Sequence, residues 1–135
     1  MDALELRSAA QAGDPDAMLA LADLIGGEDP EDPEARDWYE RAAASGRPEA
    51  MYALGVVLRC DGDDEDAEPW LRRAAETGHT DAMVELGHLF DHLDEPDRAL
   101  EWYGRAADAG NADGAANHAA LTALRGVPSA PASTG

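Results

Sequence analysis

A segment that recurs four times constrains this chain more than any other feature. The pattern Ala-Ala-x-x-Gly ends at Gly13, Gly46, Gly78 and Gly110, which lie 33, 32 and 32 residues apart. A fixed period of this length is typical of stacked repeats, because one repeat is too small to bury its own apolar face. We therefore expect the 135 residues to form an array of repeats and not a globule.

Each period carries two apolar stripes at helical spacing, so each repeat should contain two helices, A and B. The A-helix stripe of the middle repeat is Met51, Leu54, Val57 and Leu58, and its B-helix stripe is built around Trp70. The equivalent A-helix positions are Met18, Leu21, Leu24 and Ile25 in the first repeat, and Met83, Leu86, Leu89 and Phe90 in the third. The pattern predicts an all-α fold, an α-solenoid of stacked antiparallel helix pairs with about eight helices.

Turn residues set the expected boundaries. The recurring glycines follow B helices, where a left-handed residue is needed, and Asp14-Pro15 and Asp32-Pro33 are typical helix starts. We predict a half-repeat over 2–13, repeats over about 14–46, 47–78 and 79–110, a capping helix over 111–125 and a disordered tail over 126–135. Pro69 is tolerated only in a first helical turn, so its helix should start near Asp66.

Small and aromatic residues have packing interpretations. Gly55 and Gly87 lie inside A helices, where glycine is unfavourable by about 1 kcal/mol, so a close helix contact is expected at each. The tryptophans at 38, 70 and 102 lie among alanines and are interpreted as core rather than as a peptide-gripping row. An arginine follows each tryptophan by three residues, and its stem should cover the indole while its head pairs with acids of neighbouring repeats.

The phrases Ala50-Met51-Tyr52-Ala53-Leu54-Gly55 and Trp70-Leu71-Arg72-Arg73-Ala74-Ala75 resemble a Sel-one-like repeat, a type within the tetratricopeptide-repeat superfamily. The resemblance covers roughly residues 5 to 125, with a shorter loop between A and B helices than Sel-one-like repeats usually have. It implies a right-handed superhelix that serves as an adaptor, scaffold or assembly factor. It implies no catalysis.

The net charge of −19 is extreme for this length. It argues against nucleic acid and anionic membranes as partners, and it favours either a basic partner or simple solubility. All ten basic residues are arginine, which suggests a GC-rich bacterial genome. Cys60 is the only cysteine and the first residues do not resemble a signal peptide, so a cytoplasmic location is expected.

Several clusters could carry chemistry. Three acidic loops, over 28–32, 61–66 and 91–95, recur between A and B helices. They are interpreted either as a solvated edge or as a docking strip for basic partners. A calcium site at Asp61, Asp63 and Glu65 lacks the glycine and final glutamate of an EF-hand loop. His88 and His92, with Asp91 between them, are spaced to hold zinc, but a third ligand is not evident in the sequence. We predict no catalytic residue, metal site or cofactor.

The expected binding surface is the A-helix face, the concave side in this superfamily. After the core positions are assigned, apolar residues remain there with charged neighbours; the candidate partner-binding residues are Leu19, Asp23, Tyr52, Val56, Arg59, Val84 and His88. The leading hypothesis is an adaptor or scaffold that binds a protein or peptide on this face. The alternative is an acidic inhibitor or immunity-type protein that masks a basic partner by charge.

Overall fold

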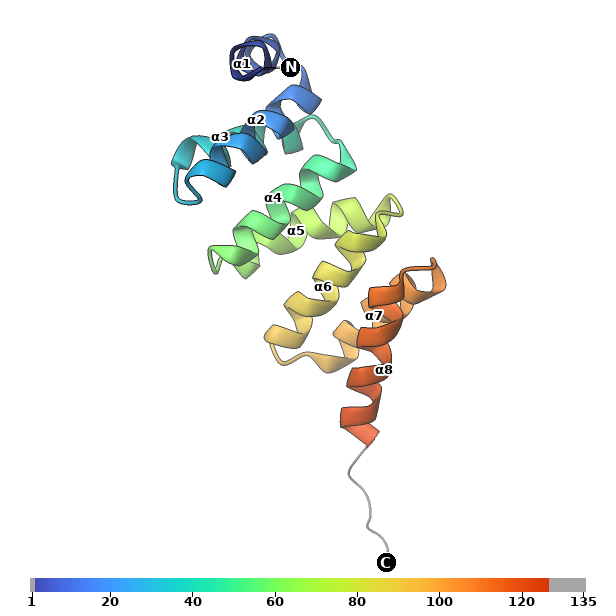
Figure 1. The fold of residues 1–135 in the computed structure, drawn as a ribbon. Coiled ribbons are helices and arrows are strands. Elements are labelled where there is room, and N and C mark those ends of the chain that lie inside the picture. The colour runs from blue at the N-terminus through green and yellow to red at the C-terminus, as the bar shows by residue number, and fades with distance from the viewer. Residues whose placement is uncertain (1, 127–135) are drawn as a thin grey trace, which may run out of the picture. The chain divides into compact units, whose positions relative to one another are not determined.

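The computed structural model describes residues 2–126, and these contain eight α-helices and no strand. In chain order they are α1 (Ala3–Gln11), α2 (Pro15–Glu28), α3 (Pro33–Ala44), α4 (Pro48–Cys60), α5 (Asp64–Glu76), α6 (Thr80–His92), α7 (Pro96–Asp108) and α8 (Ala112–Gly126). The predicted all-α fold of stacked helix pairs is confirmed (Figure 1). The expected tail lies outside the described residues, except for Gly126, which ends α8.

Local capping explains where the helices begin and end. The side chains of Asp14 and Asp32 accept hydrogen bonds from backbone N–H groups of the first turns of α2 and α3, each followed by proline. The four recurring glycines all have positive φ, between 86° and 101°, as the C′ position of a helix requires. Gly62 ends α4 in the same way, but its equivalent after α6 is Asp94, with φ of 59°.

The expected start of α5 is wrong by two residues. The helix begins at Asp64, so Pro69 lies in its second turn and not in its first. Three acidic residues in the first turn favour the early start through the helix dipole, and Arg59 pairs with Asp64 at 3.7 Å. Proline cannot donate to the carbonyl of Glu65, four residues earlier, but both residues are exposed, so water can reach this side of the helix.

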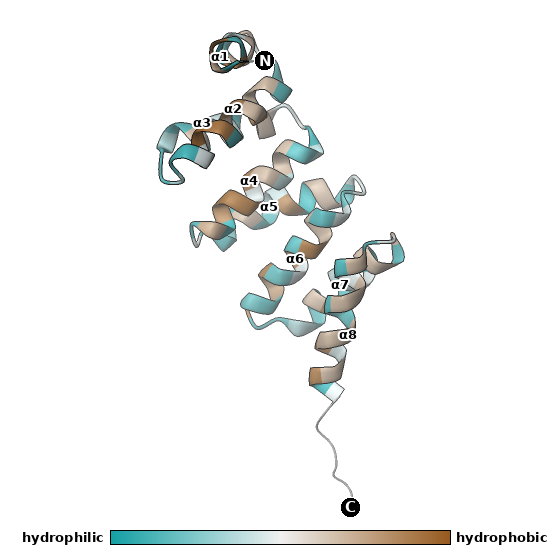
Figure 2. Cartoon of the chain, in the orientation of Figure 1, coloured by the Kyte–Doolittle hydropathy of each residue, from teal (hydrophilic) through white to brown (hydrophobic). Residues whose placement is uncertain are grey.

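The helices divide into two units, with the boundary between His79 and Thr80. In the first unit, α1 to α5 pack successively, and the hairpins α2–α3 and α4–α5 make the most extensive contacts. The A helices α2 and α4 are more hydrophobic than the B helices α3 and α5 (Figure 2). The close approach expected at Gly55 is present, because a Cβ there would lie 2.5 Å from Cγ and Cδ2 of Leu71.

The second unit contains α6, α7 and α8, of which α7 contacts both of the others. Met83, Leu86, Leu89 and Phe90 are all buried, as the A-helix stripe predicts. A Cβ on Gly87 would overlap the ring of Tyr103, so the second expected close contact is also present. Gly114 of α8 is packed similarly, with Ala106 Cβ at 2.6 Å from the Cβ it would carry.

The apolar stripe of the first repeat is less buried than predicted. Leu24 is 40% exposed, whereas Leu89, its equivalent in the third repeat, is fully buried. The A-helix stripe is therefore fully buried in the third repeat and only partly buried in the first.

The tryptophan–arginine stacks occur in all three repeats. The guanidinium carbon of Arg41 lies 4.8 Å from the ring centre of Trp38, and Arg105 lies 4.2 Å from Trp102. Trp38 and Trp102 are buried, whereas Trp70, stacked with Arg73 at 5.1 Å, is half-buried. The expected pairing of the arginine heads with acids is not observed within residues 2–126, so these side chains act as covers for the indoles.

Candidate protein-binding pocket

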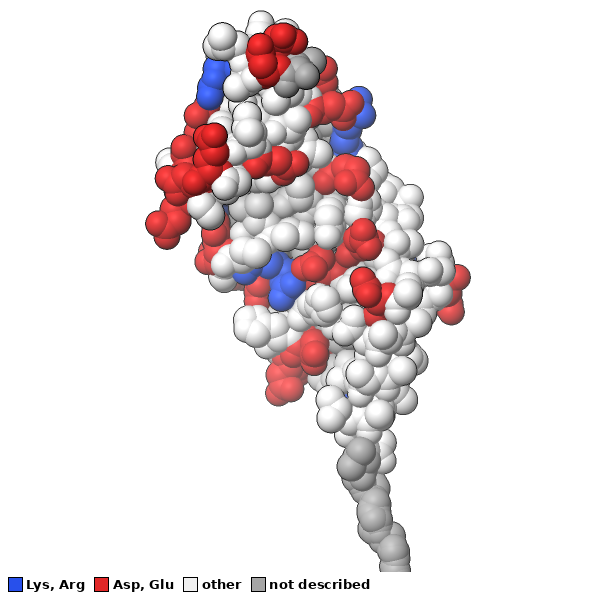
Figure 3. All heavy atoms as spheres, in the orientation of Figure 1, with Lys and Arg blue, Asp and Glu red and all other residues white. Residues whose placement is uncertain are grey.

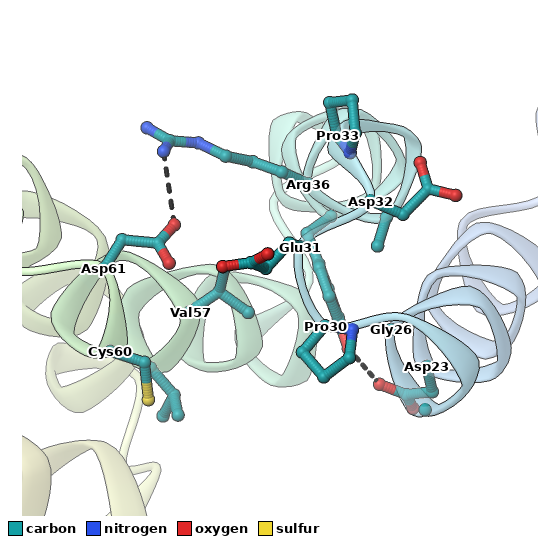
Figure 4. A pocket seen from close by; sticks show the side chains of 14 residues that line it. Asp23, Gly26, Pro30, Glu31, Asp32, Pro33, Arg36, Val57, Cys60 and Asp61 are labelled. Atoms are coloured by element: carbon teal, nitrogen blue, oxygen red, sulfur yellow. Dashed lines mark hydrogen bonds and ion pairs between the residues drawn. The ribbon is translucent and has the colours of Figure 1, made fainter.

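A pocket of about 670 Å³ lies in the first unit, between the first repeat and the A helix of the second. It is lined by Asp23, Gly26, Gly27, Pro30, Glu31, Asp32, Pro33, Ala35, Arg36, Tyr39, Val56, Val57, Cys60 and Asp61, which come from α2, the α2–α3 loop, α3, α4 and the residue after α4. Figure 4 shows Asp23 and Asp61 on opposite sides, with Pro30 and Glu31 between them. A pocket of this size is typical of ligand sites.

The Asp23 side of the pocket is held by a short hydrogen bond. The hydroxyl of Tyr39 on α3 donates to Oδ1 of Asp23 on α2 at 2.5 Å. Partial burial of the ring, and then this carboxylate, raise the pKa of Tyr39 above its ordinary value. The phenol therefore stays protonated at neutral pH and fixes the position of the Asp23 carboxylate, while Oδ2 accepts no hydrogen bond within residues 2–126.

The Asp61 side is held by Arg36. Its Nη1 lies 3.3 Å from Oδ2 of Asp61 and 3.4 Å from Oδ2 of Asp63, and so ties α3 to the loop after α4 (Figure 4). Asp32 is engaged as the N-cap of α3. Glu31, in contrast, makes no side-chain hydrogen bond or ion pair within the described part of the chain. The lining residues thus carry four carboxylates and one guanidinium, so the lining is strongly negative.

Two glycines keep the pocket open. Gly26 and Gly27 lie in the last turn of α2, where the equivalent residues of the second repeat are Arg59 and Cys60. A Cβ on Gly26 would meet only Ala35, at 3.7 Å, and a Cβ on Gly27 would meet nothing within 4 Å. Neither position has positive φ, so neither the backbone nor the packing requires glycine there. The consequence of these two glycines is open space beside α2.

Of the candidate residues in the first unit, the structure brings Asp23 and Val56 together at this pocket. Leu19 and Tyr52 lie one helical turn before them on α2 and α4, and both are half-buried. The ring of Tyr52 stacks on that of His79, with centroids 4.7 Å apart. Arg59 does not line the pocket, because it pairs with Asp64 across the α4–α5 loop.

The two remaining candidates lie in the second unit, on α6. Val84 is only 6% exposed, so it has little surface to offer a partner. His88 is half-buried, with its ring edge-on to Tyr103 at 5.6 Å and its Nδ1 3.6 Å from Oε2 of Glu85. Within residues 2–126, no three His, Cys, Asp or Glu side chains form a group that could hold a metal ion.

On the face seen in Figure 3, acidic side chains, drawn in red, are spread over much of the molecule, and basic ones, drawn in blue, are few. The acidic segment 61–66 is only partly a loop, because Asp64, Glu65 and Asp66 form the first turn of α5. In that position they interact favourably with the helix dipole, which is the structural role expected for these segments. No helix among residues 2–126 is both long and apolar enough to cross a membrane.

Sequence reasoning missed much of the pocket lining. Tyr39 and Arg36 lie on the B helix α3, and neither was proposed as a binding residue from the sequence. Val57 was assigned to the core stripe, but it is half-buried and lines the pocket. One signal was available: two consecutive glycines, Gly26 and Gly27, occur near the end of the A helix in only one of the three repeats.

Comparison with known families agrees with this architecture. The Sel1 repeat family matches residues 15–46 and 80–111, and a tetratricopeptide repeat family matches residues 50–81. No curated protein matches this chain.

Solved structures provide the same fold. A protective antigen of uropathogenic Escherichia coli strains that displays an SLR fold is 28% identical, with a TM-score of 0.80 over 91% of this chain and 29% of its own. A Sel1 repeat protein from Oxalobacter formigenes is 25% identical, with a TM-score of 0.76 over 87% of this chain and 53% of its own. MamA is 16% identical with a TM-score of 0.68, over 89% of this chain and 84% of its own, and shows the fold alone. This chain thus spans less than a third of the first relative and about half of the second.

Proposed function

Because this chain belongs to the Sel1-like and tetratricopeptide-type repeat family, we propose that it is a non-catalytic scaffold that binds a protein or peptide on its A-helix face. The observation that carries the proposal is the pocket. Asp23 and Val56 were singled out as A-helix residues without a core role, and both line it. The full candidate surface is Leu19, Asp23, Tyr52, Val56, Arg59, Val84 and His88.

The pocket combines features that protein-binding surfaces need. Val56, Val57 and Pro30 offer apolar area, and carboxylates on either side can orient a partner. Gly26 and Gly27 leave the space open, although alanine would be better in a helix by up to about 1 kcal/mol at each position. Retaining such a destabilising choice is common where function needs it.

The test is a single substitution that places a charge in the pocket, with a matched control. Val56→Asp places a carboxylate among the apolar lining, and Leu93→Asp makes the same chemical change at an exposed position outside the pocket. Each chain, immobilised, is used to capture proteins from a lysate of the source cells, and captured proteins are quantified by mass spectrometry. We expect one partner to be lost with Val56→Asp and kept with Leu93→Asp. A partner captured equally by both variants would refute the assignment of the pocket.

The second candidate function is an acidic inhibitor or immunity-type protein that masks a basic partner by charge. The net charge of −19 and the acidic surface favour it. Under this alternative the affinity falls steeply between low and high salt, because exposed charges are screened within about 10 Å at 0.1 M. A partner retained in high salt and lost with Val56→Asp would support the scaffold instead. In both cases we propose a cytoplasmic location and a partner that is neither nucleic acid nor membrane.

A further inference from the structure

We propose that the pocket takes an arginine side chain presented by a protein partner, an inference that rests on the proposed function and specifies its partner. The argument begins with charge. The carboxylates of Asp23, Glu31, Asp32 and Asp61 line the pocket with only the guanidinium of Arg36 against them. Arg36 is engaged by Asp61 and Asp63, so it neutralises one side of the pocket and leaves the other side negative.

Hydrogen-bond acceptors remain available away from Arg36, on Asp23 and on Glu31. Tyr39 uses only Oδ1 of Asp23, so Oδ2 can accept a further hydrogen bond from a partner. The Glu31 carboxylate has no side-chain partner within residues 2–126, and Figure 4 shows it in the middle of the ring of lining residues. These two carboxylates come from different elements, α2 and the α2–α3 loop, and each offers acceptors to a cation in the pocket.

The apolar lining distinguishes arginine from other cations. Val56, Val57 and Pro30 line the same space, together with Ala35, which is buried. An arginine side chain has an aliphatic stem that packs on such a surface and a planar head with five donors. The guanidinium is more weakly hydrated than the ammonium of lysine and is better suited to a partly apolar site. A bare metal ion would not use the apolar lining.

The space beside Gly26 and Gly27 admits the stem. A pocket of about 670 Å³ holds more than one side chain, so the residues flanking the arginine can also enter. A small free cation could satisfy the carboxylates but would leave most of this apolar space empty. The occupant that uses both parts of the lining is a segment of a protein.

The experiment uses the full chain and a randomised heptapeptide library displayed on phage. Peptides are selected on the unmodified protein and counter-selected on Val56→Arg, whose added guanidinium fills the pocket and repels a cationic side chain, so that only pocket-dependent binders remain. We expect these binders to share an arginine. Replacing that arginine by citrulline, which has the same shape without the charge, should weaken binding at least about tenfold, equivalent to about 1.4 kcal/mol.

A matched pair of protein variants locates the interaction. Glu31→Gln removes a pocket carboxylate, and Glu28→Gln makes the same charge change at an exposed residue of α2 that does not line the pocket. We expect Glu31→Gln to weaken the arginine peptide severalfold and to leave its citrulline form unchanged, with Glu28→Gln close to the unmodified protein. Both residues are exposed, so neither substitution threatens the fold.

The outcomes separate this inference from the proposed function. Pocket-dependent peptides that lack arginine, that carry lysine in its place, or that tolerate citrulline would overturn the arginine site while leaving peptide binding intact. An absence of pocket-dependent peptides would overturn both.

Discussion

Gly55 and Gly27 are both helical glycines of the first unit, yet we expect the same change to alanine to have opposite effects on stability. A Cβ on Gly55 would lie 2.5 Å from Cγ and Cδ2 of Leu71, whereas carbon atoms normally approach to about 3.5–4.0 Å. Leu71 is fully buried and cannot turn away without leaving the core. A Cβ on Gly27 would meet nothing within 4 Å.

The magnitudes follow from two opposing terms. Alanine is favoured over glycine inside a helix by about 1 kcal/mol, and by about half of that in the last turn, where Gly27 lies. Overpacking costs about 1–3 kcal/mol, and overlap with two buried carbons places Gly55→Ala near the upper value. We expect Gly55→Ala to lose about 2 kcal/mol of unfolding free energy and Gly27→Ala to gain about 0.5 kcal/mol.

Urea denaturation followed by circular dichroism at 222 nm measures both changes. With a denaturant slope of about 1.5 kcal/mol per molar, the midpoint should fall by about 1.3 M for Gly55→Ala and rise by about 0.3 M for Gly27→Ala. Tryptophan fluorescence gives a second readout, because Trp38 and Trp70 lie in the same unit. A midpoint for Gly55→Ala at or above that of the unmodified protein would show that α4 and α5 separate without cost, and would refute the packing argument.

Three further predictions concern single residues. Asp94→Gly should raise the unfolding free energy by about 0.5–1 kcal/mol, because φ of 59° is strained for a side-chain-bearing residue; urea denaturation measures this. The hydrogen bond from Arg7 lowers the pKa of Glu34. The ionised Glu34 therefore stabilises the folded protein above pH 4.5, and this stabilisation is lost as the pH falls through the lowered pKa. Thermal unfolding of Glu34→Gln should depend less on pH in that acid range, and an unchanged pH dependence would contradict the pairing. Because the pKa of Tyr39 is raised, its contribution to the free energy of unfolding is fully present below pH 10.0 and declines as the pH rises above 10.0. The titration of Tyr39 can be followed by subtracting the absorbance of Tyr39→Phe at 295 nm from that of the unmodified protein. Its midpoint should lie above pH 10.0, and in Asp23→Asn the midpoint should fall to a lower pH.

Features confined to one repeat were predictable because their partners lie close in sequence. The stacks of Arg41 on Trp38 and of Arg105 on Trp102 follow from three-residue spacing on a helix. The left-handed glycines follow from helix termination. The start of α5 was missed because a salt bridge from Arg59 and three acidic residues outweigh the local preference of a proline.

The candidate site was predictable only in part. Asp23 and Val56 were selected because they lie off the core stripe, and the structure places both at one pocket. Val84 met the same criterion but is buried, since periodicity identifies the side of a helix and not what covers it.

The sequence alone therefore determines the repeat, its helix pairs and the close contacts at Gly55 and Gly87, because each depends on spacing within one period of 32 or 33 residues. The tertiary structure alone decides the pocket. Its lining combines residues of α2, α3 and α4, and its size depends on how far α2 and α4 lie apart where Gly26 and Gly27 provide no side chain. That distance results from packing between neighbouring repeats, which the spacing of residues along the chain does not specify.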